Sequence, residues 1–202
     1  MSNIDAEVRP AWQSSTRVRF RVREAPPQRA WPFDHEPGYY ALGKLWLYGN
    51  TRLMGAEMVC VEQACGPPTH SAKELNAIEA EAEELVLSGK VLVCAIHSPA
   101  HQRAAVVPLR WGAPRILVLS GGFYHHLGED LLQEPFRTAR LWRYQFDKCT
   151  DLAVSRRAPD KLPTYAHHNP TIDRLIVMLA ERRWPGLAAP FDSVSPGINR
   201  MR

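Results

Sequence analysis

The sequence predicts an α/β protein, a Rossmann-like three-layer sandwich around a mostly parallel sheet, preceded by an N-terminal extension that contains one strand. Three observations predict this fold. Short apolar runs alternate with helical patterns between residues 58 and 122. These runs are almost continuously apolar, which is typical of parallel strands buried on both faces. The chain is 45% hydrophobic and 23% charged, so a full core can form.

The N-terminal extension, residues 1–45, begins with a strand pattern. Residues 17–24 (RVRFRVRE) alternate arginine with apolar side chains, as a half-buried strand does. The next segment is rich in proline, which excludes a helix and favours an extended path. The strand could join the sheet, form the edge of a homodimer or bind another partner, and the sequence leaves these alternatives open.

The α/β domain is predicted to span residues 46–184, followed by a loose C-terminal tail, 185–202. A helix begins at Ser71, because Ser71 and Glu74 have the spacing of a capping box, and it ends at Gly89. Helical periodicity predicts two further helices, at 97–111 and 169–183. Strands are expected at residues 58–64, 90–96, 115–122 and 139–146.

Three turns that follow the predicted strands form the candidate binding site. Ligands bind at the carboxyl ends of the strands in open α/β sheets, and helix N-termini at those ends favour anions. Small residues let a phosphate approach the backbone closely. The predicted ligand- or phosphate-binding residues are Cys65, Gly66, Thr69, His97, Ser98, Ala100, Ser120, Gly121, Gly122 and Phe123. Neither a GxGxxG fingerprint nor a Walker loop is present.

The last third of the chain is basic and suggests an anionic partner. Residues 137–202 carry twelve Lys or Arg against six Asp or Glu, whereas residues 46–136 carry six against ten. Phe123, Tyr124 or Trp142 could stack on bases. The predicted nucleic-acid contacts are Arg137, Arg140, Arg143, Arg156, Arg157 and Arg174. A solvated arginine surface is the alternative interpretation.

The histidines and cysteines do not predict a metal site. His97 and His101 have i, i+4 spacing, but Pro99 places His97 before the helix, and no HExxH or CxxC pattern occurs. We therefore expect His97 to line the crevice and His101 to cap or pack locally. No metal, cofactor or catalytic residue is assigned. The four cysteines fit reduced thiols, and the chain shows neither a signal pattern nor a membrane span, so a cytoplasmic protein is expected.

YGNTRLM at 48–54, two short turn motifs and the helical pattern at 169–183 follow one another along residues 46–182. In this order they resemble segments of the DNA-processing protein A (DprA/Smf) family of bacteria, in which a segment similar to YGNTRLM precedes the domain. Ala100-His101 matches its Ala-His step, and Ser120-Gly121-Gly122 matches its glycine turn. Residues 169–183 resemble a diverged form of its late helix. The family's Gly-Ser-Arg is replaced here by Gln63-Ala64-Cys65-Gly66, and its Gly-Ile-Asp step is absent.

The resemblance implies a protein that binds single-stranded DNA and works with a recombinase. A nucleotide or RNA fits the same crevice, and the sequence does not separate these ligands. Two alternatives stay open: a nucleotide or phosphosugar hydrolase with His97, Asp147 and Asp151 as acid–base candidates, and a ligand-free interaction module. We expect a binding protein rather than an enzyme.

Overall fold

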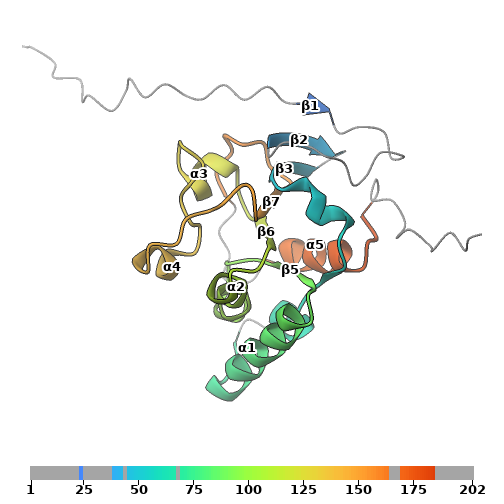
Figure 1. Cartoon of the computed structure of the whole chain (residues 1–202), viewed down its shortest axis with the longest axis vertical. Coiled ribbons are helices and arrows are strands. Elements are labelled where there is room, and N and C mark those ends of the chain that lie inside the picture. The colour runs from blue at the N-terminus through green and yellow to red at the C-terminus, as the bar shows by residue number, and fades with distance from the viewer. Residues whose placement is uncertain (1–22, 25–37, 43–44, 67–68, 164–168, 185–202) are drawn as a thin grey trace, which may run out of the picture.

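A computed structural model describes residues 23–24, 38–42, 45–66, 69–163 and 169–184 (Figure 1). The described strands form one seven-stranded sheet in the order β1-β2-β3-β7-β6-β5-β4. The strands are β1 Arg23–Glu24, β2 Gly38–Leu42, β3 Leu45–Gly49, β4 Met58–Val59, β5 Val91–Cys94, β6 Arg115–Leu119 and β7 Leu152–Ser155.

The parallel half of the sheet is built from successive units of the chain. Strands β4, β5, β6 and β7 pair in parallel in sequence order, with α1 (Ala72–Leu87) and α2 (Pro99–Trp111) in the first two connections. Strand β3 then pairs antiparallel with β7, and β2 antiparallel with β3. Because β4 to β7 run the same way, their carboxyl ends share one edge of the molecule.

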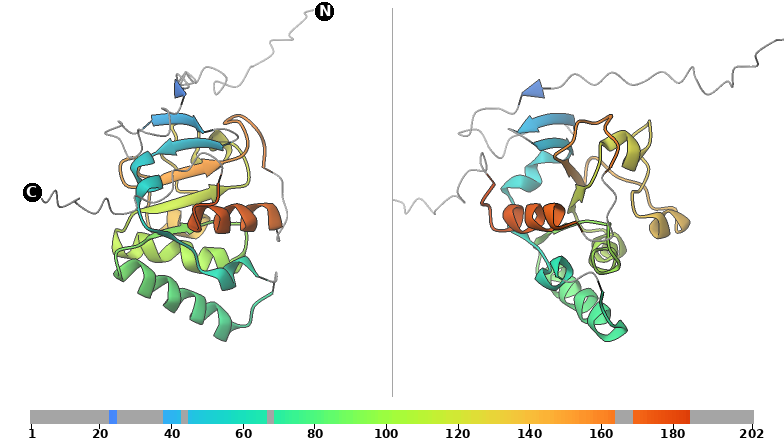
Figure 2. Two further views of the ribbon diagram at one scale, coloured as in Figure 1. Left: turned by 90° about the vertical axis from the view of Figure 1, so that its right-hand side faces the viewer. Right: turned by 180° about the vertical axis from the view of Figure 1, so that it is seen from behind.

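Helices cover both faces of this sheet, as Figures 1 and 2 show, so the predicted α/β three-layer fold is confirmed. Alternate strand residues separate the two cores. Leu117 and Leu119 of β6 face α1 and α2, whereas Ile116 and Val118 face α5 (Pro170–Ala180). Helix α5 buries four apolar side chains, each stabilising the fold by about 1.5–3 kcal/mol. They are Ile172, Leu175, Ile176 and Leu179.

Several predicted elements are confirmed with shorter bounds. The capping box of α1 is formed: the Ser71 amide donates to the Glu74 carboxylate at 2.6 Å, and the Glu74 amide to the Ser71 hydroxyl at 3.3 Å. Of the strand predicted at residues 58–64, only residues 58–59 form a strand, β4, because a 3₁₀ turn at Glu62–Cys65 follows it. Of the strand predicted at 17–24, only β1 lies within the described residues, and it pairs parallel with β2.

The strand predicted at residues 139–146 is wrong. This segment contains the end of the short helix α4 (Arg137–Leu141) and a turn, with Leu141 and Trp142 exposed and Ala139 and Phe146 buried. The fourth parallel strand is β7, which begins six residues after Phe146. Another short helix, α3 (Phe123–Leu127), follows β6. No helix in the described ranges has both the length and the apolar character to cross a membrane.

Candidate functional site

Three long helices begin at the carboxyl edge of the parallel strands. Helix α1 follows β4, α2 follows β5 and α5 follows β7. In α2 the Ser98 hydroxyl accepts the His101 amide at 3.3 Å, and in α5 the Asn169 side chain accepts the Ile172 amide at 3.4 Å. Capped helix N-termini carry partial positive charge, so this edge favours negatively charged groups.

A buried histidine–aspartate cluster lies at this edge, between α2 and α5. Asp173 Oδ1 is 2.9 Å from His101 Nε2 and 3.1 Å from His97 Nε2. The two imidazole centroids are 4.4 Å apart. All three side chains are at most 9% exposed. His97 lies before the helix, as expected, yet the two rings converge because one carboxylate from α5 holds both.

The charge state of the cluster follows from burial and these hydrogen bonds. Burial alone would raise the pKa of Asp173, but the hydrogen bonds from His101 and His97 outweigh it and lower that pKa to about 2. Burial lowers the pKa of His101, and Asp173 opposes the shift. Asp173 is therefore a carboxylate at neutral pH.

Two cysteines adjoin the cluster. Cys65 Sγ, a ring nitrogen of His101 and a carboxylate oxygen of Asp173 all lie within 4.8 Å of one another. Cys65 also forms a hydrogen bond to Cys60, which lowers the pKa of the Cys60 thiol and raises that of Cys65. The structure thus brings the predicted site residues Cys65, His97 and Ser98 to one edge.

The Ser-Gly-Gly turn after β6 is occupied by the protein's own chain. The Gly122 amide donates to the Lys161 carbonyl at 2.7 Å, and the Tyr124 amide to the Pro159 carbonyl at 3.1 Å. The Gly121 amide donates to His126 Nε2 at 3.1 Å. A Cβ on Gly122 would lie 2.2 Å from the Pro159 oxygen. Both glycines therefore permit the close approach of residues 158–163, which accounts for them without a ligand.

Phe123 is not available for base stacking, which corrects that part of the prediction. Its side chain is fully buried and packs on Tyr48, with ring centroids 6.0 Å apart. Tyr124 is partly buried, and Trp142 is 60% exposed near α4. Gly66 ends the 3₁₀ turn that contains Cys65, Thr69 is exposed, and Ala100 is buried in the first turn of α2.

The predicted arginine contacts fall into two separate groups. Arg156 and Arg157 follow β7 at the carboxyl edge, and Arg174 is exposed next to Asp173 on α5. Arg137, Arg140 and Arg143 belong to α4 and its following turn, on the opposite face of the sheet from α5 (Figure 1). The two groups do not form one continuous basic surface.

The surroundings of the two arginine groups differ. The Arg156 guanidinium lies 6.0 Å from the centroid of the Trp184 ring, and Arg157 donates to the Leu162 carbonyl at 3.3 Å. On the α4 side, Arg140 and Arg143 line a groove of about 760 Å³ that also contains Glu129, Asp130 and Glu134. The α4 groove is therefore mixed in charge.

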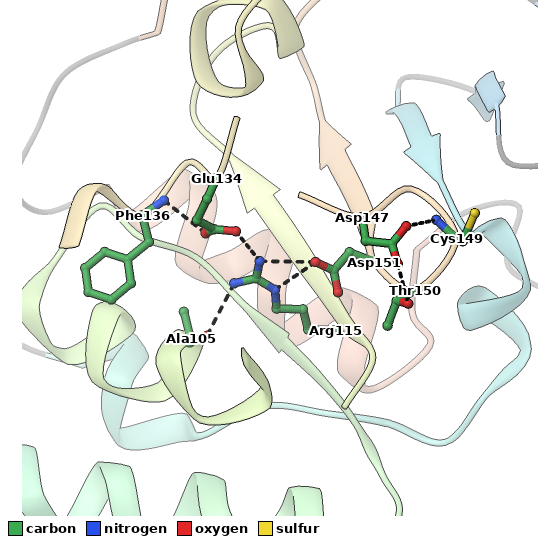
Figure 3. Close-up of polar contacts among 8 residues, drawn as sticks. All are labelled: Ala105, Arg115, Glu134, Phe136, Asp147, Cys149, Thr150 and Asp151. Atoms are coloured by element: carbon green, nitrogen blue, oxygen red, sulfur yellow. Dashed lines mark hydrogen bonds and ion pairs between the residues drawn. The ribbon is translucent and has the colours of Figure 1, made fainter. Parts of the chain in front are cut away.

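Two of the acid–base candidates lie at the other end of the sheet from His97. Asp151 precedes β7 and pairs with Arg115, the first residue of β6, at 3.1 Å (Figure 3). Asp147 accepts hydrogen bonds from the Cys149 amide and the Thr150 hydroxyl. The structure does not bring Asp147 or Asp151 together with His97, so these three residues do not form one acid–base site.

Sequence reasoning missed Asp173, the residue on which the cluster converges. A signal was present: Asp173 sits in the apolar stripe of its helix, one residue after Ile172 and three before Ile176. A carboxylate in a buried stripe usually has a partner. Its partners His101 and His97, however, lie 72 and 76 residues earlier in the chain, and helical or strand periodicity gives no information on contacts at that separation.

Comparisons with known proteins give one similar structure. No family model matches the chain, and no curated protein matches it. The X-ray structure of DNA processing protein A (DprA) from Streptococcus pneumoniae is similar over 67% of this chain, with 22% sequence identity and a TM-score of 0.48. The match spans 43% of that DprA chain, less than half its length.

Proposed function

We propose that the carboxyl edge of the sheet binds a phosphate-bearing ligand, and that this ligand is single-stranded nucleic acid. The observation that carries the proposal is the meeting of three capped helix N-termini with Arg156, Arg157 and Arg174 at one edge. Helix N-termini and guanidinium groups are both suited to phosphate oxygens.

The edge arginines support this proposal better than the arginines near α4. Arg156 and Arg174 are exposed, and Arg156 stands beside the indole of Trp184. An indole next to a guanidinium offers stacking and phosphate contact together, the combination that single-strand binders use. In the α4 groove, the Glu129 and Asp130 carboxylates counteract the two arginines, and Glu134 pairs with Arg115.

A fluorescence-anisotropy titration with a labelled single strand of about 20 nucleotides tests the proposal. We expect binding that weakens with salt and resists competition by duplex DNA. The double variant Arg156→Gln, Arg174→Gln should reduce the slope of log K against log salt by about 1.4, since each phosphate contact on a single strand contributes about 0.7.

The matched control is Arg140→Gln with Arg143→Gln, which removes the same charge near α4. Loss of binding in this control, with the edge variant unaffected, would move the site to the α4 side. Displacement of the strand by a mononucleotide would identify a nucleotide site instead. No binding at low salt would refute the proposal and leave the ligand-free interaction module.

A recombinase partner stays a prediction from the DprA/Smf resemblance, and a homodimer stays one of the alternatives for the strand pattern at residues 17–24. Size-exclusion chromatography with light scattering checks the dimer directly. The recombinase is checked by whether loading of a purified bacterial recombinase on single-stranded DNA increases when this protein is present.

A further inference from the structure

The histidine–aspartate cluster and Cys65 together have the composition of a metal centre. Cys65 comes from the turn after β4, His97 and His101 from the start of α2, and Asp173 from α5. Three distant segments thus deliver a thiol, two imidazoles and a carboxylate to one buried position. Thiolate, imidazole and carboxylate are the ligand types that zinc-class metals take.

The distances suit a tetrahedral ion after a small adjustment. Zinc bonds of about 2.0–2.3 Å place ligand atoms roughly 3–4 Å apart. Asp173 Oδ1 is already 2.9 Å and 3.1 Å from the Nε2 atoms of His101 and His97. The Cys65, His101 and Asp173 ligand atoms lie within 4.8 Å of one another, so Cys65 would move inward by about an ångström.

The charges also balance. A dication with Asp173 as carboxylate, Cys65 as thiolate and two neutral imidazoles gives a site with no net charge. Neutrality matters because both histidines and Asp173 are buried, where an uncompensated charge costs several kcal/mol. Binding displaces the thiol proton of Cys65 to solvent.

A purely structural tie between α2 and α5 is the competing explanation. It accounts for the two hydrogen bonds to Asp173. It does not require a thiol within 4.8 Å of the same carboxylate and imidazole, which a metal site does.

We propose that Cys65, His97, His101 and Asp173 form a binding site for a transition-metal dication of the zinc class. Cys65, His101 and Asp173 form the group whose ligand atoms lie within 4.8 Å of one another. His97 lies outside that group, but its Nε2 is 3.1 Å from Asp173 Oδ1, and it would be the fourth ligand. The site lies at the same edge as the proposed nucleic-acid surface, but the inference does not depend on that function, because metal binding is measured without nucleic acid.

Titration of the reduced, metal-free full chain with Co²⁺ tests the proposal. We expect one equivalent to bind, with the visible absorption of tetrahedral cobalt and a near-ultraviolet sulfur-to-cobalt charge-transfer band. Zn²⁺ should then displace the cobalt and abolish both signals. A chelator competition gives the zinc affinity, which Asp173→Asn should weaken roughly tenfold or more.

Cysteine variants assign the ligand. Cys65→Ser should remove the charge-transfer band, whereas Cys149→Ser, an exposed cysteine at the other end of the sheet, should retain it. Cys60→Ser should also retain it, since Cys60 is assigned no ligand role. Circular dichroism establishes that each variant is folded.

The proposal is overturned if the folded chain binds no stoichiometric Co²⁺. It is equally overturned if the band survives Cys65→Ser or is lost only in Cys60→Ser. Because the readout is spectroscopic, a failure of nucleic-acid binding leaves this test unaffected.

Discussion

His126 shows how one half-buried side chain makes stability depend on pH. Its Nε2 accepts the Gly121 amide at 3.1 Å, so the ring must be neutral there. Burial lowers the pKa of His126 to about 4, and the neighbouring His125 adds to the shift. In the unfolded chain the pKa is near 6.5, so the unfolded state binds more protons between pH 6.5 and 4.

We therefore predict that the free energy of unfolding falls as pH drops from about 6.5 to 4, with His126 contributing at most about 3 kcal/mol. Urea denaturation at a series of pH values measures this. His126→Gln should flatten the dependence. The exposed neighbour is the control: His125→Gln should leave most of the slope, and an equal effect of both variants would contradict the assignment.

Single residues of the site were predictable in part. A buried strand followed by His97, Ser98 and a proline places those residues at a helix start on the carboxyl edge, and the structure has them there. The convergence of His97 and His101 was not predictable, because Pro99 places His97 before the helix and so removes the i, i+4 geometry. It depends on Asp173, which a separate helix supplies from the other face of the sheet.

At the level of elements, the long helices and the apolar strands β5 and β6 were predicted, whereas β7, α3 and α4 were not. Helices α1 and α5 carry apolar stripes over several turns, so their patterns are unambiguous. Residues 139–146 alternate like a strand, but packing of Ala139 and Phe146 on the core selects a short helix and a turn. Strand β7 ends in Ser155 and has an apolar run of only three residues, shorter than the runs that predicted β5 and β6.

The segment after β7 packs against the turn after β6, and this contact can be tested by substitution of a glycine. Residues 158–163 close over the Ser-Gly-Gly turn, and a Cβ on Gly122 would collide with the backbone of Pro159 and Ala158. We expect Gly122→Ala to destabilise the protein by about 1–3 kcal/mol, because the backbone must shift. Chemical denaturation measures this change.

Gly66→Ala is the matched control for that variant. Its Cβ would meet only the Gln63 carbonyl at 3.2 Å, so a smaller loss is expected. Should Gly122→Ala prove as stable as the parent, residues 158–163 would not hold the close contact described for them, and the turn after β6 would be open to a ligand.

For the whole molecule, the two ends of the sheet hold different sets of polar side chains. The carboxyl edge gathers the histidines, Asp173, Cys65 and Arg156. The amino end holds a buried charge network in which the Arg115 guanidinium binds Glu134 at 2.5 Å and Asp151 at 3.1 Å (Figure 3). Burial alone would lower the pKa of Arg115, but the two carboxylates raise it, so this arginine stays charged.

The variant Arg115→Met therefore tests whether the amino end of the sheet is independent of the carboxyl edge. Removing the guanidinium leaves two carboxylates buried without their partner, which should destabilise the protein by about 3–5 kcal/mol in urea denaturation. Arg115 begins β6 and hydrogen-bonds to Asp151, just before β7, and to Glu134, in the segment before α4. Loss of the guanidinium therefore weakens the packing of all three segments together. At temperatures where the variant is still folded, cobalt stoichiometry and single-strand affinity should match the parent. A folded Arg115→Met protein that loses either property would show that the two ends are coupled, because Arg115 lies at the amino end and its hydrogen bonds are to Asp151, Ala105 and Glu134.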